Sequence, residues 1–471
     1  MLDATSQVTA PAHSARSRTT APGRAPPVVG VRAVLGSLSS ALRSPLDFLL
    51  QQRAIHGDVY SLDLGATRMI LLNHPRHAQH VYRDHHARYG KSGPFWDLIR
   101  ALVGEGLPVS EGELWRRQRR MIQPQFHRER ISVMIDQLAR AVRDSMASWD
   151  ALADAGGPVN LASELSRVAM QAIVRVIFGA DLDPCDADEI GREVGHAFDF
   201  ILRGMLFRSL PPWLPVPGRR RYLAAIRTID RHIFRLVEQR RRQRGDGMDL
   251  ITGLIESVDA ETGAAMSDAQ LRDEVVAMFL AGYETVASML TFAIDLLARH
   301  PEHARAARAE ILEVLGEREP GLADLPRLGV TLAVVREALR LHPPVFFLPR
   351  QALVDDEIDG FAIPAGAIVA PVVHVIHRHP DVWDHPDRFD PGRFMALRAG
   401  GRHPLAWMPF GTGHRQCLGK DVALLEGQII LARILQRYEL APVAATPPRV
   451  HLGATARPAG DVQIRFKRRT A

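Results

Sequence analysis

The stretch Phe410-Gly-Thr-Gly-His-Arg-Gln-Cys-Leu-Gly419 decides the fold, because it places a single cysteine in a glycine-rich loop. Read as F-G-x-G-x-R-x-C-x-G, it specifies more than half of its positions. Cys417 is one of only two cysteines in the chain. A cysteine in such a loop can bind a metal as thiolate, provided that nearby positive charge or aimed N–H donors keep it deprotonated.

The glycines and the segment that follows prepare this loop for a flat cofactor. Gly411, Gly413 and Gly419 permit φ > 0 and a close approach of the backbone. Residues 420–430 have a helical pattern, which puts Cys417 at the electropositive N-terminal end of a helix. Thiolate is a strong ligand of haem iron and donates electron density that favours O–O cleavage. The loop therefore predicts a haem whose iron is bound by Cys417.

Other residues near the two cysteines fit this interpretation. Arg415 has the right charge for a haem propionate, and Phe410 can pack against the sulfur side. Cys185 lies between acidic residues that oppose a thiolate, and we interpret it as a small buried apolar side chain. Two cysteines are too few for a disulfide framework, which fits a reducing compartment.

The rest of the chain predicts a mainly α-helical protein with a smaller β-rich part. Residues 59–73 contain two strand patterns and are typical of a hairpin. Helices are expected after Asn160, after Pro217 and through residues 331–341. After Pro349 the pattern changes to strands and turns, and short strands are expected again at the C-terminus.

A long helix is predicted after Ser267. Ser267 and Gln270 form a capping-box pattern, and no proline follows until Pro301. About 33 residues at 1.5 Å each give a helix roughly 50 Å long. Since residues 276–282 are apolar on most faces, we expect this helix in the middle of the protein.

Through these features the chain resembles the cytochrome P450 monooxygenases from about residue 45 to the C-terminus. The resemblance implies the cytochrome P450 fold, with haem b between the long central helix and the cysteine loop with its C-terminal helix. Glu337-Ala-Leu-Arg340, followed by Phe389-Asp-Pro-Gly-Arg-Phe394, resembles the Glu–Arg–Arg arrangement of the family. By that resemblance Glu337, Arg340 and Arg393 form a buried network that positions the cysteine loop.

Ala281-Gly-Tyr-Glu-Thr285 matches the family's A-G-x-D/E-T pattern at every position. The resemblance implies that Gly282 lets the long helix open beside the iron, giving room to dioxygen. It also implies that Thr285 hydrogen-bonds dioxygen and that Glu284 delivers protons through water. For Gly282, a tolerated glycine at a close helix contact is an alternative interpretation.

The propionates of the haem are assigned by the same resemblance. Trp115 and Arg119 resemble the family's W-x-x-x-R, in which both side chains meet one propionate. Arg350 resembles the arginine that binds the other propionate. Guanidinium forks match carboxylates well, so Arg119, Arg350 and Arg415 serving two propionates is chemically sensible.

Substrate contacts are expected at apolar positions, for which plain core packing is the alternative. The resemblance places them at Phe95, Trp96, Phe198, Ala281, Val345, Phe346 and Phe347. Their character predicts a hydrophobic small molecule, such as a terpenoid, fatty acid, steroid or polyketide, that is hydroxylated or epoxidised with dioxygen.

Electrons are expected from a separate protein, because the chain has no G-x-G-x-x-G fingerprint after a strand. A ferredoxin or flavodoxin with its NAD(P)H reductase is the expected donor. The net charge is +6, with arginine clusters at 116–120, 219–221 and 240–244. These clusters are solvated helix faces in the simpler interpretation, and Arg116, Arg117, Arg120 and Lys420 form a basic face for an acidic donor in the other. No zinc-finger or RNA-binding pattern accompanies them, so nucleic acid is not expected.

The expected organisation is a flexible leader rich in Ser, Thr and Pro over residues 1–44 and one haem-binding monooxygenase domain over residues 45–471. A transit peptide would share the leader's arginine-rich, acid-poor composition. The N-terminus has no run of 18 apolar residues, so no transmembrane anchor is expected there. We expect a cytoplasmic monomer.

Two other functions are alternatives for this chain. A peroxygenase or isomerase on the same scaffold often lacks the acid–alcohol pair, which Glu284 and Thr285 provide here. A haem protein without catalysis, either an electron carrier or a gas sensor, would need a second iron ligand or a signalling domain, and neither is evident.

Overall fold

The computed structural model describes residues 23–30, 44–63, 67–146, 148–206, 216–242, 249–395 and 400–469. The chain is mainly helical, as predicted. Its longer helices are α7 (Arg128–Met146), α9 (Leu161–Phe178), α10 (Pro184–Leu206), α11 (Arg219–Arg242), α13 (Asp268–Arg299), α14 (Pro301–Leu315), α15 (Gly329–Leu341) and α17 (Lys420–Arg437). Its shorter ones are α3 (Pro45–His56), α4 (Pro75–Gln79), α5 (Pro94–Val103), α6 (Gly112–Ile122), α8 (Trp149–Asp154), α12 (Leu250–Ile255) and α16 (Val373–Ile376).

The strands form a larger mixed sheet and three small ones. The larger sheet has the order β1-β2-β3-β9-β6-β4 and contains β1 (Val28–Val29), β2 (Val59–Asp63), β3 (Arg68–Leu72), β9 (Ile368–Pro371), β6 (Arg350–Ala352) and β4 (Tyr89–Gly90). The small sheets are β10-β13-β5, β11-β12 and β7-β8. Their strands are β5 (Val159–Asn160), β7 (Asp356–Ile358), β8 (Phe361–Ile363), β10 (Tyr438–Pro442), β11 (Val450–Leu452), β12 (Ala456–Pro458) and β13 (Gln463–Arg468).

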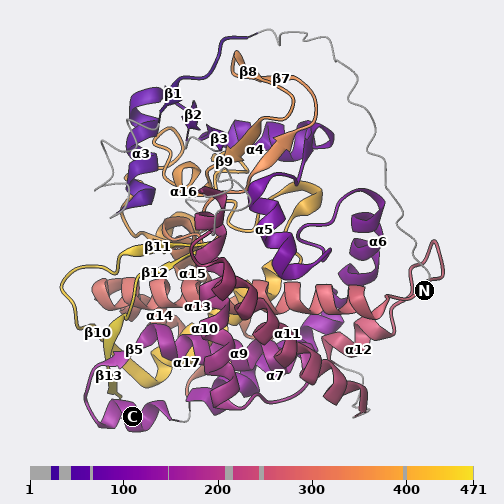
Figure 1. Cartoon of the computed structure of the whole chain (residues 1–471). Coiled ribbons are helices and arrows are strands. Elements are labelled where there is room, and N and C mark those ends of the chain that lie inside the picture. The colour runs from indigo at the N-terminus through magenta and orange to yellow at the C-terminus, as the bar shows by residue number, and fades with distance from the viewer. Residues whose placement is uncertain are drawn as a thin grey trace, which may run out of the picture.

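Helix α13 forms the centre of the fold. Figure 1 shows it crossing the middle of the molecule, with β1, β2, β3 and β9 on one side and α7, α9 and α17 on the other. Most of its residues are buried, because α9, α15 and α17 pack against it. Among the described helices it is the one with the length and apolar character of a membrane span, but 78% of its most apolar window is buried. That burial fits a core helix.

Local sequence explains where several elements begin. The Asn160 side chain accepts the Ser163 N–H at the start of α9, and the Ser267 hydroxyl accepts the Gln270 N–H at the start of α13. Of the capping box predicted at Ser267, the bond from Gln270 N–H to the Ser267 hydroxyl is the half found among the described residues. The predicted hairpin is confirmed, with β2 antiparallel to β3. Its turn was expected at Gly65-Ala66-Thr67, of which residues 65 and 66 lie outside the described residues.

The N-terminal leader differs from the prediction in one segment. Residues 23–30 are ordered, and β1 pairs in parallel with β2, as Ser61 N–H donates to Pro27 O at 2.7 Å. Arg24 also lies over the Phe361 ring, 4.3 Å from its centroid. Two β-branched valines next to the free edge of β2 explain this pairing. The leader therefore cannot be treated as one unit over 1–44, and residues 1–22 and 31–43 lie outside the described residues.

Candidate active site

The cysteine loop is held in place by backbone contacts just before α17. Cys417 N–H donates to Phe410 O at 3.0 Å. Gly411 and Gly413 have φ values of 66° and 69°, so both adopt the left-handed conformation that glycine favours. At Gly413 a Cβ atom would collide with the Tyr82 carbonyl oxygen. Both positions agree with the sequence interpretation.

Gly419 has a different role from the one predicted. Its φ is −80°, an ordinary value, so it needs no left-handed conformation. It is the N-cap of α17, and a Cβ there would lie 4.0 Å from Cys417 Sγ. The glycine instead keeps the space beside the sulfur open, where a larger side chain would approach it.

Opposing effects act on the Cys417 thiol. Burial raises its pKa above the usual value, whereas hydrogen bonds from the Gly419 and Lys420 N–H groups and the charge of Arg119 lower it. Cys417 is exposed to the empty space of the cavity that it lines. A metal ion of the haem would shift the balance toward the thiolate, because the aimed N–H groups at the helix start already favour negative charge.

A cavity of about 390 Å³ separates the cysteine loop from α13. Phe410, Gly411, Cys417 and Gly419 line it on one side, and Ala281, Gly282 and Thr285 line it from α13. The predicted juxtaposition of the two motifs is thus present in the fold. A flat cofactor would fit between two such walls, and Cys417 is the residue that would hold its iron.

Four cations gather in the wall of the same cavity. They are the three predicted arginines, Arg119, Arg350 and Arg415, and a lysine that the sequence interpretation missed, Lys91. Glu111 is the carboxylate that acts electrostatically on Arg350, Arg415 and Lys91. Burial lowers the pKa of Arg350 and Lys91, because neither charge is well solvated. Arg350, Arg415 and Lys91 outnumber Glu111, the carboxylate that acts on all three, and the two propionates of a haem would supply further negative charge.

Aromatic rings and carbonyl groups fix these cations. Arg415 stacks on Trp115 with its guanidinium carbon 4.1 Å from the ring centroid, and its Nη1 donates to Ser110 O at 2.8 Å. Arg350 lies over Tyr82 at 5.1 Å and over Trp96 at 5.6 Å. Lys91 Nζ lies 4.8 Å from the centroid of the same Trp96 ring. The ring contacts hold flexible side chains in one direction, toward the cavity.

Arg119 is held differently, by hydrogen bonds at both ends of its guanidinium. Its Nη1 donates to Gln416 O and its Nε donates to Gln123 Oε1, each at 3.0 Å. The first contact ties α6 to the residue before Cys417. Arg119 can therefore serve both a propionate and the position of the cysteine loop.

The expected substrate residues divide into two groups. Trp96, Ala281 and Val345 line the cavity. Phe95, Phe198, Phe346 and Phe347 do not belong to its wall and are buried in the hydrophobic core. The Phe95 ring packs against Phe347 at 5.2 Å, so these aromatic side chains support the wall from behind. For these four phenylalanines, packing in the hydrophobic core is therefore the interpretation that fits, in place of direct substrate contact.

The motif at the middle of α13 lies beside the cavity. Thr285 Oγ1 donates to Ala281 O at 2.6 Å, which holds the hydroxyl against the helix one turn back. A Cβ on Gly282 would lie 2.5 Å from Ile173 Cδ1 of α9, so close helix packing requires glycine here. Ile173 and Gly282 both line the cavity. Close packing against α9 and a local opening of α13 beside the cavity are therefore compatible explanations for Gly282.

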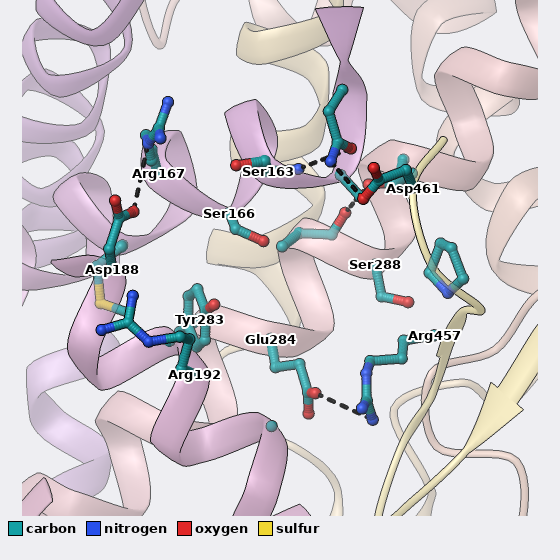
Figure 2. A pocket seen from close by; sticks show the side chains of 18 of the residues that line it. Ser163, Ser166, Arg167, Asp188, Arg192, Tyr283, Glu284, Ser288, Arg457 and Asp461 are labelled. Carbon is teal, nitrogen blue, oxygen red and sulfur yellow. Dashed lines mark hydrogen bonds and ion pairs between the residues drawn. The ribbon is translucent and has the colours of Figure 1, made fainter. Parts of the chain in front are cut away.

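Glu284 lies on a different face of α13 from Thr285. It lines a second cavity of about 570 Å³, which is polar and bounded by α9, α10, α13 and β12. Figure 2 shows Glu284 and Arg457 pointing toward one another there, with Oε1 and Nη1 3.8 Å apart. Thr455 Oγ1 donates to Glu284 Oε2 at 2.6 Å. Burial raises the pKa of Glu284 to about 7, although Arg457 and Thr455 act in the opposite direction.

This arrangement differs from the simple expectation that the acid and the alcohol face the iron together. Neighbouring residues of a helix point about 100° apart, so the two side chains reach different cavities. Any proton from Glu284 has to pass α13 to reach Thr285.

The predicted charged network lies behind the cysteine loop. Arg340 and Glu337 are fully buried and form a paired contact, with Nε–Oε2 at 2.7 Å and Nη2–Oε1 at 2.8 Å. Arg393 Nε lies 3.4 Å from Glu337 Oε1. Arg393 also donates to Asp384 O and His385 O, and Asp390 N–H donates to Glu337. The three residues are thus brought together, and they join α15 to the 384–394 loop.

Cys185, expected to be buried, is exposed near the start of α10. It lies next to Pro184 and Asp186, and an exposed helix start leaves no apolar neighbours to cover it. It takes no part in the site.

A loop cysteine beside a helix start, a largely apolar cavity in front of it and a group of cations in the cavity wall define a haem-thiolate protein. The cytochrome P450 family model matches residues 26–465, and the chain belongs to this family. It is accordingly a haem-dependent monooxygenase.

Relatives and solved structures agree with this assignment. The chain is 34% identical over 91% of its length to "Cyclooctat-9-en-7-ol 5-monooxygenase" from Streptomyces melanosporofaciens, covering 90% of that protein. It is 30% identical over 94% of its length to "Pentalenene oxygenase" from Streptomyces avermitilis, covering 98% of it. The crystal structure of the cytochrome P450DA heme domain superposes with a TM-score of 0.84 at 27% identity, covering 96% of this chain and 98% of that one.

Proposed function

We propose that the protein hydroxylates or epoxidises a terpenoid, using haem b and electrons from a separate donor protein. The observation that carries this proposal is the cavity, in which Cys417 faces Ala281, Gly282 and Thr285 across a largely apolar space. The names of the two relatives add support, because both describe oxygenation of a cyclic terpenoid-type compound.

Haem ligated by a thiolate supplies the activation of dioxygen when it is bound. For the whole reaction, substrate, O₂, NAD(P)H and a proton give oxygenated substrate, water and NAD(P)⁺. One oxygen atom enters the C–H or C=C bond, and the other leaves as water with two electrons and two protons. The chain itself must therefore bind the substrate, exclude bulk water and move protons.

In this proposal, Thr285 and Glu284 have separate roles in moving protons. The Thr285 hydroxyl can turn from Ala281 O toward a ligand in the cavity and hold a hydrogen bond there. Glu284 can take up and release protons near neutral pH, since burial raises its pKa to about 7. The polar second cavity, with Ser163, Ser166 and Ser288 in its wall, offers the path by which water reaches Glu284.

Ligand titration tests the substrate class. Cyclic sesquiterpene and diterpene hydrocarbons and alcohols are added to the oxidised haem enzyme, and the Soret shift that follows loss of iron-bound water is recorded. We expect saturable shifts with terpenoids and weaker ones with fatty acids and steroids of similar size. Shifts produced only by polar or charged compounds would reject the hydrophobic-substrate proposal.

The electron donor is expected to be an acidic ferredoxin or flavodoxin. Part of the expected basic face is neutralised within the chain, since Arg116 pairs with Glu113 at 2.9 Å and Arg120 pairs with Asp259 at 3.0 Å. The remaining positive charge would steer an acidic donor and be screened by salt. We expect the reduction rate with such a donor to fall as salt rises, and a flat profile would reject the charged docking face. A cytoplasmic, monomeric enzyme is part of this proposal.

A further inference from the structure

Two carboxyl groups in the wall of the haem cavity, those of Glu274 and Glu426, have no role in the chemistry described so far. Glu274 lies on α13, eleven residues before Thr285 and on the face that also carries Ala277, Met278 and Ala281. It is part of the cavity wall, and its side chain is fully buried. Helix geometry places it about 10 Å along the axis from Ala281 and about 16 Å from Thr285.

The two oxygens of Glu274 are in different situations. Oε2 accepts the Leu107 N–H at 2.9 Å, whereas Oε1 has no hydrogen-bond partner among the described residues. A buried polar atom without a partner destabilises the fold. Burial, helped by the neighbouring charge of Asp273, raises the pKa of Glu274 to about 8, against the Leu107 N–H, which lowers it. At neutral pH the group is therefore mostly an uncharged acid with an O–H to donate.

Anchoring of the loop at 104–107 does not explain this carboxyl group. The adjacent Asp273 already accepts the Glu105 N–H at 2.8 Å, and Gln118 Nε2 donates to Glu105 O at 2.7 Å. One acceptor atom at position 274 would complete the loop contacts, and an amide would supply it. The second oxygen is left over, in a wall that is otherwise mostly apolar at this end of the cavity.

We propose that Glu274 is a specificity-determining residue that hydrogen-bonds a neutral oxygen function of the substrate, such as a hydroxyl, ketone or ether. The inference deepens the proposed function: the substrate is an already oxygenated hydrophobic molecule, oxidised about 10 Å or more from that oxygen. An earlier hydroxylation or a water-quenched cyclisation must then supply it.

Ligands anchored at the iron test this without knowledge of the natural substrate. 1-Decylimidazole and 10-(imidazol-1-yl)decan-1-ol bind haem iron through nitrogen, and ten methylenes extend about 12 Å. 1-Butylimidazole and 4-(imidazol-1-yl)butan-1-ol form the short pair, whose hydroxyl does not reach Glu274. Dissociation constants come from the Soret shift of wild type, Glu274→Leu and Glu274→Gln. Met278→Leu is the matched control, because it places leucine on the same helix and in the same cavity.

The expected result is a change in one ratio only. The preference for the long alcohol over the long alkane should fall about tenfold in Glu274→Leu and stay within about threefold of wild type in Glu274→Gln. The short pair, and both pairs in Met278→Leu, should keep the wild-type ratio. An unchanged long-pair ratio in Glu274→Leu would overturn the proposal. So would 10-(imidazol-1-yl)decan-1-amine binding far more tightly than the alcohol, since that points to recognition of a cation.

A measurement on wild type covers the case in which Glu274→Leu does not fold. The methyl ether of the long alcohol only accepts hydrogen bonds, so its advantage over 1-decylimidazole should disappear as pH rises through about 8. A pH-independent advantage in wild type would overturn the proposal. Because imidazole binds iron whatever the substrate is, a failure to bind terpenoids with this discrimination intact would reject the substrate class alone.

Discussion

Replacing Arg340 by leucine should destabilise the protein more than any other single change behind the cysteine loop. Arg340 is fully buried on α15 and pairs with Glu337 through two contacts of 2.7 and 2.8 Å. It also donates to His377 O at 2.9 Å, Pro386 O at 2.6 Å and Arg388 O at 3.1 Å. The guanidinium of Arg340 therefore hydrogen-bonds one buried carboxylate and three backbone carbonyl groups.

The magnitude follows from what the substitution leaves behind. Removing one partner of a buried ion pair costs about 3–5 kcal/mol. Each buried carbonyl without a donor adds about 1–3 kcal/mol, although these costs overlap when the loop relaxes or admits water. Asp390 N–H and Arg393 still contact Glu337 and reduce the loss of stability. We expect a loss of at least about 4 kcal/mol, a large part of the roughly 5–15 kcal/mol that stabilises a typical domain.

Urea unfolding followed by far-UV circular dichroism measures this loss, and the red-shifted Soret band of the CO complex reports the cysteine loop. Arg336→Leu on the same helix is the matched control, because Arg336 Nε has no hydrogen-bond partner among the described residues. Arg340→Lys should lose most of the same free energy, since an ammonium cannot form the fork. A loss below about 1 kcal/mol in Arg340→Leu, equal to that of the control, would refute the reasoning.

Three further outcomes are expected. Cys417→Ser should abolish the red-shifted Soret band of the CO complex while haem is retained. A variant that keeps the red-shifted band would show that Cys417 is not the iron ligand. Gly282→Ala should cost about 1–3 kcal/mol because its Cβ meets Ile173 Cδ1, and Ile173→Val should restore most of it in the double variant. Glu284→Gln should lower turnover about 100-fold or more while substrate binding stays within about threefold. Burial raises the folded-state pKa of Glu284 from 4.5 to about 7, so the folded protein binds the extra proton between these values. The contribution of Glu284 to the free energy of unfolding therefore falls as pH rises through that window. Thermal melts of Glu284→Gln at several pH values should lack this fall.

Sequence and structure agree most closely where a pattern is local. The start of α9 at Asn160 and the strands of the hairpin follow from capping and alternation, which nearby residues control. The ordering of Val28–Val29 was not predictable in this way, because it depends on the free edge of β2, some thirty residues away. Phe95 and Phe347 show the same limit, since apolar character alone does not distinguish a cavity wall from the core behind it.

The sequence by itself determined the haem-thiolate chemistry. Three short-range features indicate this chemistry directly. They are the cysteine between glycines at a helix start, Glu337 with Arg340 on one helix face, and the Gly282–Thr285 motif. Only the tertiary structure decided where the remaining charges point. It directed Glu284 away from Thr285 into a second cavity and left Glu274 with an unpartnered oxygen in the haem cavity. The physical reason is that a side chain's pKa and partners depend on burial and on distant segments, here Leu107 and Arg457, which spacing along the chain does not encode.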